Sequence, residues 1–185
     1  MPLTTLDQKS ALIVIDLQHG ILSLPTVHPA DVVIGHAAAL AATFRRHHLP
    51  VVLVNVAGGA PGRSEQSRIP GQLPPGWTDL VPELDRQPED HLVTKQTWGA
   101  FTGTGLDDHL RKQGVTQVVI AGIATSIGVE STARQAHELG YNVALAVDAM
   151  TDRSIDAHLN SVGRIFPRLG ETGTIAEIIA LLDGR

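Results

Sequence analysis

Short apolar runs rich in β-branched residues alternate along this chain with longer segments of helical character. Such runs are typical of strands that are buried on both faces of a sheet. Strand–helix alternation implies right-handed βαβ units. The sequence therefore predicts an α/β fold: a single-domain, doubly wound, mainly parallel sheet of five to six strands flanked by helices. The strands predicted in this way cover residues 11–18, 51–57, 91–95, 116–124 and 142–149.

Local end signals delimit the predicted helices. Asp31 is the expected N-cap of a helix that runs to about His48. Gly114 and Gly140 are expected to follow the C-terminal ends of two further helices, and Pro167 is expected to end another. With a last helix near the C-terminus, these predicted helices cover residues 31–48, 106–114, 126–139, 154–166 and 174–183.

One segment, residues 58–90, breaks the alternation and is rich in glycine and proline. Long loops inside compact domains are usually functional, so this segment is predicted to be a binding loop or lid. No shift in composition marks a second domain, and 185 residues fit one medium-sized domain. Residues 1–185 are therefore predicted to form a single domain.

Composition excludes several kinds of function. The chain has no cysteine, which rules out disulfides, thiolate metal sites and thiol catalysis. Its net charge is −5 and it has no run of lysine and arginine, so we expect no nucleic-acid partner. No apolar run approaches the roughly 20 residues of a membrane span, and no signal-peptide core is present, so a cytoplasmic location is expected. The nine histidines show no metal-ligand spacing, so no metal is predicted.

Polar residues stand where the predicted strands end. Asp16 and Gln18 close the first strand, Lys95 closes the third and is followed by Trp98 and Phe101, and the fourth runs into the sequence GIATSIGVES. In open α/β sheets, ligands bind beyond the carboxyl ends of the strands. Each residue also has an ordinary structural interpretation as a helix cap, a solvated strand end or core packing. Their joint position at one edge favours a functional site.

These motifs resemble the isochorismatase-like hydrolase superfamily over nearly the whole chain. The resemblance rests on Asp16 in IDLQ, Lys95 in TKQTWGAF and the turn GIATSIGVESTARQA, where Gly128 stands at the position of the usual nucleophilic cysteine. In the amidase branch that cysteine attacks a carbonyl carbon. The stretch NVAGGAPGRSEQSR after the second strand also lacks the histidine of the nicotinamidase metal site. The resemblance therefore implies a chemistry other than amide hydrolysis.

Isochorismatases, which have glycine at this position, hydrolyse a vinyl ether without a protein nucleophile. The resemblance implies that Asp16 is the general acid, Lys95 is its electrostatic partner and Gly128 completes the site. Burial would raise the pKa of Asp16 and the lysine charge would lower it, and the sequence leaves the balance open. A cis peptide between Ile123 and Ala124 is also implied. Backbone N–H groups beyond it could bind a substrate oxygen, or Thr125 or Ser126 could simply cap the helix.

The resemblance implies a small, anionic substrate, since two loop arginines could clamp a carboxylate. The sequence KQTWGAF and the small residue at Ala124 depart from true isochorismatases, so the substrate itself stays open. The predicted substrate-binding residues are Gln18, Arg63, Arg68, Trp98, Phe101, Ile123, Ala124 and Thr125. No cofactor is expected, and a homo-oligomer, dimer or tetramer, is implied. The alternative is a catalytically inactive, ligand-binding pseudoenzyme derived from a cysteine amidase.

Overall fold

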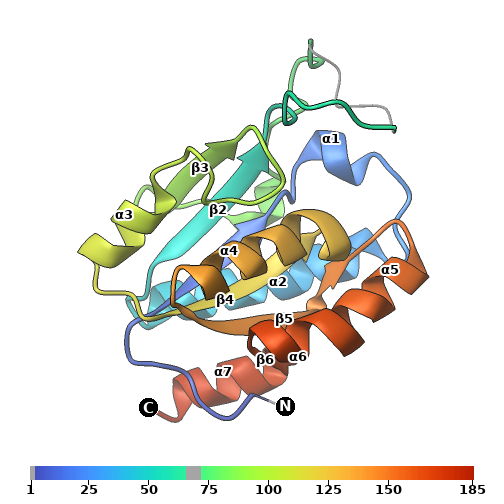
Figure 1. The fold of residues 1–185 in the computed structure, drawn as a ribbon. Helices are drawn as coiled ribbons and strands as arrows, with labels where there is room; N and C mark the ends of the chain where they lie inside the picture. Colours follow the sequence, from blue (N-terminus) through green and yellow to red (C-terminus); the bar gives the residue numbers. More distant parts are fainter. Residues whose placement is uncertain (1–2, 66–71) are drawn as a thin grey trace.

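A computed structural model describes residues 3–65 and 72–185 and confirms the α/β fold (Figure 1). Six parallel strands form one sheet in the order β3-β2-β1-β4-β5-β6. The order reverses beside β1, which creates the switch point where ligands bind in such sheets. The strands are β1 (Ser10–Ile15), β2 (Val51–Val56), β3 (His91–Lys95), β4 (Gln117–Ile123), β5 (Asn142–Thr151) and β6 (Glu171–Gly173).

Two helical layers cover the sheet and divide the core in two (Figure 1). One face packs against α2 (Ala30–Arg46) and α7 (Ile175–Asp183). The other packs against α3 (Leu106–Lys112), α4 (Glu130–Glu138) and α6 (Phe166–Leu169). Side chains of β1 alternate between the two cores, with Leu12 and Val14 on the α2 side and Ile13 and Ile15 on the other. This period of two explains why every residue of β1 is buried and apolar or small.

The helix-end predictions were partly right. Gly114 and Gly140 each lie one residue beyond a helix C-cap with positive φ angles of 72° and 86°, as expected for glycine at that position. Asp31 is not an N-cap, because α2 begins one residue earlier with Pro29 at the cap. The Asp31 carboxylate instead lies in the first helical turn, where the helix dipole favours a negative charge.

The prediction that Pro167 ends a helix was wrong. The helix α5 (Ile155–Asn160) continues through the π-helical turn η3 (Ser161–Ile165) into α6. Pro167 lies at the start of α6, two residues after the π-helical turn ends, and the helix continues past it to Leu169. A second π-helical turn, η2 (Thr125–Val129), connects β4 to α4. Both turns lie on the same side of the sheet.

The described part of the predicted loop 58–90 leaves β2 at the carboxyl-end edge of the sheet (Figure 1) and returns to the opposite edge, where β3 begins beside the start of β2. It contains one short 3-10 helix, η1 (Pro82–Leu84), and Leu80 forms a β-bridge with Gln18 after β1. A short helix, α1 (His19–Leu22), adjoins it, and the His19 amide donates to the carbonyl of Asp79. The loop is thus tied to the end of β1.

In the described ranges, no helix combines the length and the apolar character that crossing a membrane requires.

Candidate active site

A buried ion pair lies at the carboxyl-end edge of the sheet. Asp16 directly follows β1, and Lys95 is the last residue of β3. Because β2 lies between these strands, only a long side chain can connect them. The Lys95 Nζ donates to Asp16 Oδ2 at 2.7 Å and to the carbonyl of Thr97 at 3.2 Å. Asp16 is 5% exposed and Lys95 is 1% exposed, so solvent does not screen their charges.

The two oxygens of Asp16 have different surroundings. Oδ2 accepts from Lys95, whereas the buried Oδ1 has no hydrogen-bond partner among the described residues. Burial raises the pKa of Asp16 from an ordinary 3.8 to about 6, although the charge and the hydrogen bond of Lys95 both lower it. Burial is therefore the larger influence. The carboxyl can hold a proton near neutral pH, and Oδ1 is the oxygen available to carry it.

Gly128 lies in the turn η2, against the end of β1. A Cβ atom built at this position would lie 2.9 Å from Ile15 Cγ2 and 3.2 Å from Asp16 Oδ2. The methyl group of Ile15 is fully buried and has little freedom to move. The close packing therefore explains glycine here, and it brings the main chain of the turn beside the acid. Asp16, Lys95 and Gly128 thus come together from three separate elements.

The turn begins with the implied cis peptide bond, between Ile123 and Ala124. The side chain of Ile123 is buried in the core on the α2 side, and Ala124 packs against the same core. Neither Thr125 nor Ser126 caps the following helix through its side chain. The alternative interpretation of these two residues as caps was therefore wrong.

A second buried aspartate, which the sequence analysis missed, anchors this turn. Asp152 directly follows β5, and its Oδ2 accepts from the Ser126 amide at 2.7 Å. Its Oδ1 accepts from the amides of Arg153 at 2.7 Å and Ser154 at 3.2 Å. The strand-end rule that selected Asp16 could have selected Asp152 too, because both follow a buried strand.

Histidines provide the other anchor of the turn. The Thr125 hydroxyl and His158 Nδ1 are 2.9 Å apart and both residues are buried. The ring of His28 lies edge-on at 4.6 Å from that of His158. Burial, and secondarily the proximity of His28, lowers the pKa of His158. This shift favours the neutral form of the His158 imidazole. The Thr125 hydroxyl, predicted to bind substrate, is already engaged.

Gln18 is also fully engaged within the protein. Its Oε1 accepts from the Val56 amide at 2.7 Å, and its Nε2 donates to the carbonyls of Val56 and Trp77, both at 3.1 Å. The side chain is completely buried. Gln18 thus links β1, β2 and the long loop, and shapes the edge of the site through the backbone it holds.

The remaining predicted binding residues differ in their exposure. Trp98 is 64% exposed. Phe101 packs against the core, with its ring 6.0 Å from that of Tyr141. Arg63 is exposed on the long loop, and Arg68 lies outside the described residues. Among the described residues, no hydrogen bond or ion pair joins Trp98, Phe101 or Arg63 to Asp16, and their part in binding stays a prediction.

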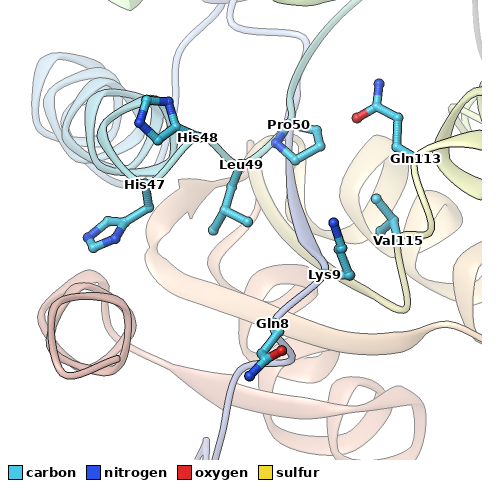
Figure 2. A pocket seen from close by; sticks show the side chains of 8 residues that line it. All are labelled: Gln8, Lys9, His47, His48, Leu49, Pro50, Gln113 and Val115. Atoms are coloured by element: carbon cyan, nitrogen blue, oxygen red, sulfur yellow. The ribbon is translucent and has the colours of Figure 1, made fainter.

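The opposite edge of the sheet carries a hollow of about 270 Å³ (Figure 2). It lies where β1 and β2 begin, far along the strands from Asp16. One of its lining residues, His47, is bound through Nε2 to Asp183 Oδ1 at 2.7 Å. Across residues 3–65 and 72–185, no three histidine or acidic side chains are placed to hold a metal ion. The ion pair beside Gly128 is therefore the best candidate for a catalytic centre.

The fold and this edge define a class of α/β proteins that position a strand-end acid, a lysine and a tight turn together. A family model described as the isochorismatase domain matches residues 10–177. The chain belongs to the isochorismatase family, whose members are hydrolases.

Individual relatives agree with this assignment. The isochorismatase family protein YwoC of Bacillus subtilis (strain 168) is 42% identical over 179 residues, which cover 93% of each chain. A solved structure of an isochorismatase family protein from Burkholderia thailandensis superposes with a TM-score of 0.92 and is 44% identical, covering 97% of this chain and 98% of that one. The ureidoacrylate amidohydrolase RutB of Pseudomonas syringae pv. syringae (strain B728a) is 30% identical, covering 80% of this chain and 73% of that protein.

Proposed function

We propose that this protein hydrolyses a small anionic metabolite by general-acid catalysis from Asp16, without a covalent intermediate. The observation that carries the proposal is the environment of the Asp16 carboxyl. Its Oδ1 is buried without a hydrogen-bond partner among residues 3–65 and 72–185, and burial raises the pKa of the carboxyl to about 6. A general acid is most effective when its pKa lies near the working pH.

The reaction class that fits best is hydrolysis of a vinyl ether. Protonated Asp16 transfers its proton from Oδ1 to the terminal alkene carbon of the substrate. Water then adds to the resulting oxocarbenium ion and returns a proton to the carboxylate. The hemiketal that forms breaks down to a ketone and an alcohol, so every atom is accounted for by substrate and water. No protein nucleophile is needed, which agrees with a chain without cysteine.

Lys95 has a positioning and an electrostatic role in this proposal. Its hydrogen bond at 2.7 Å holds Oδ2, so that Oδ1 is the oxygen that faces a substrate. Its positive charge stabilises the carboxylate left after proton transfer. The negative charge of the substrate would be bound by arginines of the long loop, where Arg63 is exposed and Arg68 lies close to it in sequence. In this proposal the loop 58–90 acts as the lid.

The test is turnover by the wild-type protein and by Asp16→Asn. The substrates are isochorismate, as the vinyl ether, and nicotinamide with a panel of small amides and ureido compounds. We expect cleavage of the vinyl ether and a fall of about 10² to 10⁴-fold in kcat/KM for Asp16→Asn, the usual contribution of a general acid. Circular dichroism spectra of both proteins serve as the control for folding. Amide cleavage that survives in Asp16→Asn would contradict the acid mechanism.

The pH dependence provides a second test. Because the protonated carboxyl is the active form, kcat/KM should fall as pH rises through about 6, about tenfold per pH unit well above it. If no substrate in either panel is turned over, equilibrium binding of the same compounds would then distinguish an enzyme with another substrate from the ligand-binding alternative.

A further inference from the structure

The segment that follows β3 is held in place by side chains of α4. In the described chain, the amides of residues 97–101 donate to no main-chain carbonyl. The Ala100 amide donates instead to the hydroxyl of Thr132 at 3.1 Å. The next amide, of Phe101, donates to Gln135 Oε1 at 3.0 Å. Thr132 and Gln135 both belong to α4, so the position of this segment depends on that helix.

The Thr132 hydroxyl makes two hydrogen bonds at once. Besides accepting from Ala100, it donates to the carbonyl of Gly128 at 2.7 Å. A threonine inside a helix often bonds the carbonyl four residues earlier, but Ala100 is 32 residues away in the chain. A hydroxyl carries one hydrogen and two lone pairs, so it can join an amide to a carbonyl. Thr132 is completely buried, so solvent does not compete for either bond.

The same segment contributes to holding the ammonium group of Lys95. Its Nζ has two partners, Asp16 Oδ2 at 2.7 Å and the carbonyl of Thr97 at 3.2 Å. The Thr97 hydroxyl donates to the carbonyl of Gly99 at 3.3 Å. Gly99 lies directly against α4, where a Cβ atom would clash with the side-chain amide of Gln135. A shift of this segment would therefore move the Thr97 carbonyl and, with it, the ammonium beside Asp16.

We propose that Thr132, with Gln135 from the next turn of α4, is a positioning residue of the candidate site. Its hydroxyl couples the segment that holds Lys95 to the turn that contains Gly128. Thr132 acts through the Ala100 amide and the Gly128 carbonyl and has no part in the proton transfer itself. This role rests on the proposed function for the choice of site, and on no particular substrate.

The test is a titration of the Asp16 carboxyl by ¹³C NMR, with its signal assigned by its absence in Asp16→Asn. The charge and the hydrogen bond of Lys95 lower the pKa of Asp16. Thr132→Val keeps the side-chain shape but removes both hydrogen bonds, so the ammonium should be held less firmly. The pKa of Asp16 should then rise above its wild-type value by about 0.5 or more. This measurement needs no turnover.

Three further variants sharpen the test. Thr132→Ser keeps the hydroxyl, and its Asp16 should titrate as in the wild type. Gln135→Met releases the Phe101 amide at a half-buried position and should raise the pKa of Asp16 by less than Thr132→Val does. Thr43→Val is the matched control, because Thr43 is a buried threonine of α2, on the other face of the sheet. It should leave the pKa of Asp16 unchanged.

A purely structural role would lower the stability of Thr132→Val without moving the pKa of Asp16, and that result would overturn the proposal. A lower pKa, or a serine variant shifted as far as the valine variant, would overturn it too. Amide NMR spectra check that each variant folds. If Thr132→Val does not, an unchanged pKa in Gln135→Met overturns the proposal. A wild-type pKa near 3.8 would instead contradict Asp16 as the acid, and the differences between variants would still test Thr132.

Discussion

Asp16 and Asp152 occupy equivalent places in the fold but differ in the hydrogen bonds that their carboxylates accept. Each directly follows a buried strand at the same edge of the sheet, and they are 5% and 2% exposed. Asp152 accepts three backbone hydrogen bonds through both oxygens. Asp16 accepts one, from Lys95, and its Oδ1 has no partner in the described chain.

The contrast separates a carboxylate that supports structure from one that is available for chemistry. Three backbone donors stabilise the negative charge of Asp152 and fix the turn beside Gly128. A buried oxygen without a partner is unfavourable for folding, by about 1–3 kcal/mol. Asp16 therefore contributes less to stability than its burial suggests, and functional sites are where such unfavourable groups are found.

The largest effect on stability is expected when the cation beside Asp16 is removed. Lys95→Met should lower the free energy of unfolding by about 3–5 kcal/mol near pH 8, because a buried carboxylate is left without its counter-ion. The loss should shrink near pH 5, where Asp16 takes up a proton. Urea denaturation measures both. Asp16→Asn/Lys95→Met, which removes both charges, should be much closer to wild type. A Lys95→Met protein as stable as wild type near pH 8 would show that the ion pair is not formed.

The next effect is the pH dependence of wild-type stability. The pKa of Asp16 is about 6 in the folded protein against an ordinary 3.8, so between these values the folded state binds more protons than the unfolded state. The free energy of unfolding should therefore fall as pH rises through this window, by about 3 kcal/mol from this group.

Urea denaturation from about pH 4 to about pH 7 measures this contribution as the difference between wild type and Asp16→Asn, in which other groups cancel. Asp152→Asn, by contrast, should retain the fall with pH that Asp16 causes. Parallel curves for wild type and Asp16→Asn would mean that Asp16 titrates normally and that its surroundings resemble those of an exposed carboxyl.

A smaller effect is expected for Asp152→Asn, about 1–3 kcal/mol of destabilisation. The amide has one acceptor oxygen, so its NH₂ group must face either the Ser126 amide or those of Arg153 and Ser154. Thermal and urea unfolding measure the change. Asp108→Asn, at an exposed aspartate in the first turn of α3, is the matched control and should stay within about 0.5 kcal/mol of wild type. Equal stability of the two variants would remove the distinction between Asp16 and Asp152.

The smallest effect concerns the second anchor of the turn. Thr125→Val keeps the side-chain shape but leaves His158 Nδ1 without its partner, and about 1 kcal/mol of destabilisation should follow. Thr94→Val, at an exposed position on β3, controls for the change from threonine to valine. If Thr125→Val is no less stable than this control, Asp152 alone anchors the turn.

Sequence patterns were sufficient to predict the strands and site residues whose signals lie in a short stretch of the chain. The five apolar runs became strands because β-branched residues suit a sheet covered on both faces. The three-residue strand β6 has no such run and was missed. Asp16 and Lys95 were found because strand ends converge at one edge, and the glycine at 128 was found through the family motif.

Signals that depend on distant partners could not be found in this way. The role of Asp152 requires the Ser126 amide, 26 residues away in the chain. The amide of Gln18 looked available for substrate until β2 and Trp77 were placed around it. The direction of the Asp16 pKa shift depended on how deeply the carboxyl is buried, which no spacing of residues reveals.

The close packing of Gly128 against Ile15 also bears on how such a chain can change over generations. A single base change converts a glycine codon of the form GGY to a cysteine codon, so one mutation could introduce a nucleophile at this position. The fully buried methyl of Ile15, 2.9 Å from the position of the new Cβ, opposes it. Replacing Ile15 with alanine first would open the space but would destabilise the sheet by about 2–5 kcal/mol. A route to cysteine at this position therefore passes through a less stable protein, which helps to keep glycine there.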